Sequence, residues 1–123
     1  MSYPEDTINW QAIDIIDKWL DTSVSDHYKI QPLAQDWARI SKVGEEVGEA
    51  IQAFVGYTGQ NPRKGFTNDQ EKVLDELADV VFTAILAIQH FTKDANVTRA
   101  ILRSSLRNIY HRIKVIIMDT ANE

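Results

Sequence analysis

Residues 33–54 read LAQDWARISKVGEEVGEAIQAF, and this stretch decides the fold class of the chain. Its large apolar residues recur every three or four positions, which is the period of a helix that buries one stripe. They are Leu33, Trp37, Ile40, Val47, Ile51 and Phe54. Pro32 suits the first position of a helix. The pattern therefore predicts a helix over residues 32–57.

Three further segments show the same period, and they predict helices over residues 7–20, 69–91 and 98–118. No run alternates for long enough to indicate a strand. Residues 80–88 are apolar on nearly every side, so we expect this part of its helix to be buried on most of its surface. The chain is therefore predicted to be all-α, a four-helix bundle formed by one domain over residues 1–123.

The composition excludes several classes of function. The chain has no cysteine, which rules out disulfides, thiolate metal sites and cysteine nucleophiles. A net charge of −5 argues against a duplex nucleic acid partner, because phosphate contacts need clustered Lys and Arg. The longest apolar run is too short to span a membrane, and the N-terminus does not resemble a signal peptide. We therefore expect a cytoplasmic protein with no membrane partner.

Carboxylates gather on two of the predicted helices. Glu45, Glu46 and Glu49 share one arc of the first, and Glu76 and Asp79 lie side by side on the second. A solvated acidic face also accounts for the first group. Asp79 directly precedes the apolar run, where a buried carboxylate needs a partner. A metal ion held between the two helices would supply that partner for both groups.

The candidate ligands are all hard oxygens, which favours Mg²⁺, with Mn²⁺ as the alternative. His27, His90 and His111 form no Glu-x-x-His pair of the kind found in di-iron bundles. We expect these histidines to have surface or packing roles.

Basic residues lie close to the acids in the sequence. Lys42 precedes Glu46 by one helical turn, and Arg63 and Lys64 lie on the loop between the two acidic helices. All three are candidates for binding substrate phosphate. Solvated loop positions account for Arg63 and Lys64 equally well.

Glu45-Glu-Val-Gly-Glu49, followed by Asp75-Glu-Leu-Ala-Asp79, resembles the EExxE…ExxD signature of the MazG-like, all-α nucleoside triphosphate pyrophosphohydrolases. That superfamily includes the dimeric all-α dUTPases and the phosphoribosyl-ATP pyrophosphohydrolases. The segment at 56–65 also resembles the loop of a MazG-like subgroup of short, single-domain proteins. The resemblance covers about residues 37–90.

The resemblance implies Mg²⁺-dependent cleavage of the α–β phosphoanhydride of an NTP or dNTP by metal-activated water. The products would be a nucleoside monophosphate and pyrophosphate. By position, the metal ligands would be Glu46, Glu49, Glu76 and Asp79. The catalytic residues would be Glu46 and Glu45, with Glu45 a ligand or a group that orients the attacking water. The resemblance also implies a homodimer or homotetramer.

Two other interpretations remain open from the residues alone. The bundle is a non-catalytic dimerisation module whose acids hold a structural cation or a basic partner. Alternatively, it is a purely structural bundle with a solvated acidic face. Metal binding without affinity for any nucleoside triphosphate would favour the module.

Overall fold

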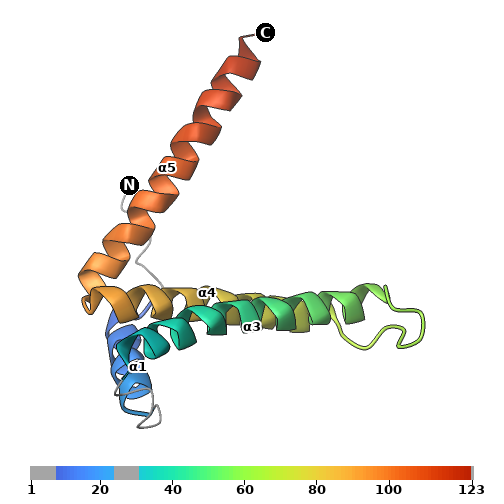
Figure 1. Ribbon diagram of the computed structural model, residues 1–123. Helices are drawn as coiled ribbons and strands as arrows, with labels where there is room; N and C mark the ends of the chain where they lie inside the picture. Colours follow the sequence, from blue (N-terminus) through green and yellow to red (C-terminus); the bar gives the residue numbers. More distant parts are fainter. Residues whose placement is uncertain (1–7, 24–30, 123) are drawn as a thin grey trace.

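Four helices form the described part of the computed structural model, which covers residues 8–23 and 31–122 (Figure 1). They are α1 (Trp10–Ser23), α3 (Pro32–Thr58), α4 (Gln70–Thr92) and α5 (Ala95–Ala121). Within these two ranges there is no strand. The prediction of an all-α bundle is confirmed.

The helix ends follow local capping chemistry. Gly59 ends α3 in the left-handed conformation, with φ 65°, where a residue without a Cβ is favoured. The Asp69 carboxylate accepts a hydrogen bond from the backbone N–H of Lys72 and so caps α4. Asp94 caps α5 in the same way, so this helix begins three residues before its predicted start at Thr98. The predicted start of the first helix, Thr7, lies outside the described residues.

The helices α3 and α4 form an antiparallel hairpin, and α1 packs across one end of it (Figure 1). From that same end α5 turns away, and its C-terminal part projects from the rest of the molecule. Among the described residues five apolar side chains are buried, and four of them come from α3 and α4. They are Ile13, Ala50, Ala53, Ile85 and Ala87.

Much apolar surface stays exposed on the single chain. Val81 and Phe82, in the middle of α4, are 53% and 44% exposed. The expectation that residues 80–88 are buried on most sides is therefore wrong for these two residues, whereas Val80 and residues 83–88 are buried or half-buried. Asp79, just before this run, is also exposed.

The surface area gives a measure of this exposure. The chain exposes 9560 Å², about 2,900 Å² more than the roughly 6,700 Å² typical of a compact monomer of 14.0 kDa. None of the helices in the described ranges is long and apolar enough to cross a membrane.

Candidate metal centre

Three carboxylates meet between α3 and α4. Glu46 and Glu49 come from α3 and Glu76 from α4, and one oxygen of each lies within 4.8 Å of the others. The antiparallel hairpin produces this meeting, since it sets the middle of α3 beside the first turns of α4. The structure thus brings together three of the four residues predicted as metal ligands.

The environment of these carboxylates fits a divalent cation. The side chains of Glu46 and Glu76 are only 12% and 11% exposed. In each of them Oε2 is buried and has no hydrogen-bond partner. A buried polar atom left unpaired is costly, and an ion ligated by these oxygens would remove the cost. The negative charge of Glu46 is the main reason that the pKa of exposed Glu49 is raised.

The other predicted site residues lie around this centre. Glu45 is exposed and forms an ion pair with Lys42 at 3.2 Å. Asp79 lies outside the group of three carboxylates. Arg63 is exposed on the loop, whereas Lys64 lines a cleft beside the carboxylates.

The cleft has a volume of about 590 Å³ and lies between the second half of α3, the following loop and the start of α4. Glu49 and Glu76 form part of its wall, so the candidate metal centre opens directly into it. Its remaining polar lining consists of two cations, three amides and a hydroxyl. These residues are Lys64, Lys72, Gln52, Asn61, Asn68 and Thr67. The amides were not predicted, because no spacing in the sequence links them to the acids. Lys72 precedes Glu76 by one helical turn but was not among the predicted site residues.

Gly56 lets the loop close against α3. Its carbonyl accepts a hydrogen bond from the N–H of Thr67 at 3.0 Å, and the Asn68 amide donates to the carbonyl of Ala53 at 3.3 Å. A Cβ at position 56 would lie 2.5 Å from Nδ2 of Asn68 and would also collide with the Thr67 hydroxyl. The loop wall of the cleft therefore depends on a glycine at this position.

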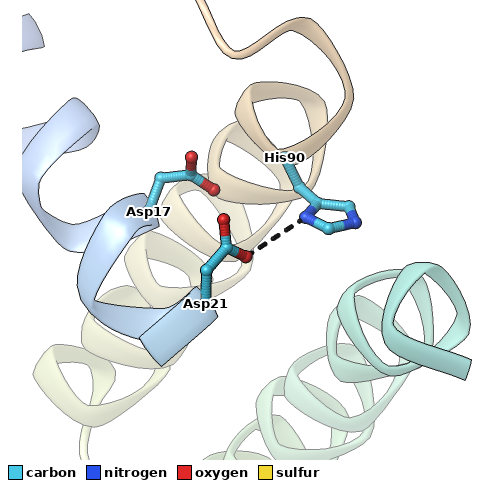
Figure 2. A group of neighbouring side chains, drawn as sticks. All are labelled: Asp17, Asp21 and His90. Atoms are coloured by element: carbon cyan, nitrogen blue, oxygen red, sulfur yellow. Dashed lines mark ion pairs between the residues drawn. The ribbon is translucent and has the colours of Figure 1, made fainter. Parts of the chain in front are cut away.

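A second group of potential ligands lies where α1 meets α4. Figure 2 shows Asp17 and Asp21 of α1 facing His90 of α4, with ligand atoms within 4.8 Å of one another. Two basic side chains already form ion pairs with these carboxylates. Nη2 of Arg39 lies 3.0 Å from Asp17 and 3.1 Å from Asp21, and Nζ of Lys93 lies 3.0 and 2.6 Å from the same two residues. We therefore interpret this group as an ion-pair network.

The network explains how three helices are held together at this end. Burial raises the pKa of Asp21, but Lys93 and Arg39 outweigh burial, and the pKa is lowered overall. The His90 ring adds a second contact with α3, at 2.7 Å between its Nε2 and Asp36. The expectation of a surface or packing role for His90 did not include this polar contact. His27 lies outside the described residues.

Carboxylates face one another on an antiparallel helical hairpin, and a polar cleft lies beside them. These features define an all-α protein suited to binding a cation and a polar ligand together. The family model of phosphoribosyl-ATP pyrophosphohydrolase matches residues 11–103, and the chain belongs to this family. The match confirms the resemblance to the MazG-like superfamily and indicates a pyrophosphohydrolase, a hydrolase that acts on acid anhydrides. No curated protein and no solved structure matches the chain.

Proposed function

We propose that this protein is a Mg²⁺-dependent pyrophosphohydrolase that cleaves the α–β phosphoanhydride of a nucleoside triphosphate, releasing a nucleoside monophosphate and pyrophosphate. The observation that carries the proposal is the pair of buried, unpartnered oxygens on Glu46 and Glu76, beside a cleft that also holds Lys64. Family membership supports the class of reaction.

In this proposal Glu46, Glu49 and Glu76 hold the ion, and Asp79 is a fourth ligand by its place in the motif. Once bound, Mg²⁺ would neutralise phosphate charge and lower the pKa of a bound water. Glu45 is exposed at the rim of the site and is the candidate for orienting that water or accepting its proton. The volume of the cleft suits a ligand of nucleotide size.

The test is a panel of canonical and deoxynucleoside triphosphates with Mg²⁺, in which pyrophosphate and phosphate are detected separately. We expect pyrophosphate only, and a loss of at least about a hundredfold in Glu76→Gln, since one ligand is lost from the metal centre. The matched control is Glu71→Gln, an exposed acid on the same helix, which should keep its activity. Absence of pyrophosphate release between pH about 7 and 9.5 would overturn the proposal.

Phosphoribosyl-ATP is a second candidate substrate, and the family match is the observation that favours it. It belongs in the same panel, and the ratio of kcat/KM values ranks it against the triphosphates. Binding of Mg²⁺ without affinity for any of these nucleotides would instead support the non-catalytic module.

We also propose that a second copy of the chain covers the apolar face of the α3–α4 hairpin. The excess of about 2,900 Å² of exposed surface is well above the roughly 800 Å² that each partner buries in a standard interface. An apolar groove runs along the hairpin and offers the contact surface. Its large side chains are Val47, Ile51, Phe54, Val73, Leu77 and Val80.

Sedimentation equilibrium at micromolar concentration tests this assembly. The expected mass is at least twice that of the 14.0 kDa chain, and a tetramer would double it again. Phe54→Asp places a charge in the groove and should shift the mass toward that of one chain. Monomeric wild-type protein would contradict the proposal.

A further inference from the structure

One nitrogen of the ion-pair network, at the end where α1 meets α4, lacks a hydrogen bond. The side chain of His90 is 8% exposed, and its buried Nδ1 has no hydrogen-bond partner among the described residues. Nδ1 faces Asp21 but lies 3.5 Å from Oδ1 of that residue, which is too long for a good hydrogen bond (Figure 2). A buried nitrogen without a partner is costly, so this position indicates room for a ligand of its own.

The other ring nitrogen fixes the form that His90 takes. Nε2 lies 2.7 Å from Oδ1 of Asp36, and an ionised carboxylate can only accept, so Nε2 carries the proton. In neutral His90 the lone pair therefore lies on Nδ1, on the side of the ring that faces α1. Histidines that ligate metals usually donate their far N–H to a carboxylate in this way. The contact with Asp36 thus leaves Nδ1 free to act as a ligand.

Two carboxylates of α1 complete a set of three ligands. Asp17 and Asp21 each offer an oxygen, and these atoms and a ring nitrogen of His90 all lie within 4.8 Å of one another. The two aspartates are four residues apart, so they lie on one face of the helix. One imidazole with two carboxylates suits a transition ion such as Zn²⁺, whereas Mg²⁺ prefers oxygen ligands alone. This group therefore differs in metal preference from the carboxylate centre between α3 and α4.

Lys93 lies where such an ion would bind. Its Nζ contacts Oδ2 of Asp17 at 3.0 Å and Oδ2 of Asp21 at 2.6 Å. Because the Lys93 side chain is 48% exposed, it can turn into solvent on its flexible stem. Arg39 is buried, and its Nη2 contacts Oδ1 of both aspartates. Departure of Lys93 would therefore free two Oδ2 atoms, while Arg39 would still hold the two Oδ1 atoms.

The charge balance favours this exchange. The three carboxylates of the network belong to Asp17, Asp21 and Asp36, and they face the two basic side chains. One negative charge is therefore left over when the His90 ring is neutral. A divalent ion in place of the Lys93 ammonium adds one positive charge and removes this excess. Such matching has most effect where the charges are shielded from water.

We propose that Asp17, Asp21 and His90 form a site for a transition-metal ion of the zinc class, which enters by displacing the ammonium of Lys93. The ion would join α1 to the last turn of α4. When the ion is absent, the ion-pair network holds the same helices together. The site needs neither nucleotide nor catalysis, so it stands or falls separately from the proposed function.

Calorimetry with Zn²⁺ tests the site, with every sample carrying Glu76→Gln to remove one ligand from the carboxylate centre. His90→Gln keeps a donor for Asp36 but lacks Nδ1, and it should weaken Zn²⁺ binding at least about tenfold. Lys93→Met should strengthen binding up to about fivefold, because a half-exposed competing ion pair is lost. The matched control is Lys18→Met, which removes an exposed lysine of α1 that pairs with Asp14 at 2.9 Å. It should change the affinity less than about twofold.

Nitrogen NMR of the histidine rings in the unaltered chain gives a second readout that does not depend on the folding of any variant. One equivalent of Zn²⁺ should shift Nδ1 of His90 and leave the exposed His111 ring unchanged, and Mg²⁺ should shift neither. Opposite changes of Zn²⁺ affinity in His90→Gln and Lys93→Met would support the site. An unmoved His90 resonance, or one Zn²⁺ affinity shared by all three variants, would overturn it, whether or not the protein cleaves nucleotides.

Discussion

Replacement of Asp17 by Asn should destabilise the fold more than any other conservative change at the end where α1 meets α4. Asp17 is 1% exposed, and its partner Arg39 is 8% exposed. The substitution keeps the shape of the side chain and removes its charge. Removing one partner of a buried ion pair costs about 3–5 kcal/mol, because the other charge stays buried without full compensation.

The remaining contacts place the expected cost at the lower end of this range. In the variant, Arg39 still has an ion pair with Asp21 at 3.1 Å, so its charge remains partly compensated. Lys93 also loses Asp17, but its side chain is 48% exposed, and such a pair contributes less than about 1 kcal/mol. We therefore expect Asp17→Asn to lower the free energy of unfolding by about 3 kcal/mol.

Urea denaturation followed by far-ultraviolet circular dichroism measures this change, with all samples at one protein concentration. With a slope of about 1–2 kcal/mol per molar urea, the midpoint should fall by about 1.5–3 M. Asp119→Asn is the control, since Asp119 is exposed on the last turns of α5, and it should change stability by less than about 0.5 kcal/mol. If both variants shift the midpoint equally, the ion-pair network does not hold these helices together.

Three further outcomes are expected. Lys93 and Arg39 hold the pKa of Asp21 below its ordinary value, so the contribution of its carboxylate to stability is present above about pH 4 and is lost as the pH falls through the folded-state pKa. Below about pH 4, urea midpoints of the wild type should therefore fall more steeply than those of Asp21→Asn. Gly56→Ala should displace Asn68 and cost about 1–3 kcal/mol, with faster amide exchange across the cleft loop; unchanged exchange would contradict the close contact. Glu49→Gln should weaken Mg²⁺ binding in calorimetry at least about tenfold and Glu45→Gln less than about threefold, and the reverse order would exchange their roles.

The sequence predicted the helices well, because their apolar period is a local property. Residues 32–57 were predicted as a helix, and α3 runs from Pro32 to Thr58. Of the candidate site, the meeting of Glu46, Glu49 and Glu76 followed from motif spacing on two helices. The exposure of Val81 and Phe82 was not predicted, because periodicity shows which residues are apolar but not which of them another element covers.

The ion-pair network and the cleft lining could not be predicted, because their partners are distant in sequence. Asp17 is 22 positions from Arg39 and 76 positions from Lys93. Each of these residues, taken alone, is an ordinary polar position on a helix.

The large exposed surface of the chain has a consequence for how the protein behaves on dilution. If native structure is completed by association, the law of mass action links folding to the number of chains per volume. Thermal midpoints should then rise with concentration, and activity per chain should fall in dilute assays. The cell could therefore set the activity of this protein through its abundance alone, without any effector.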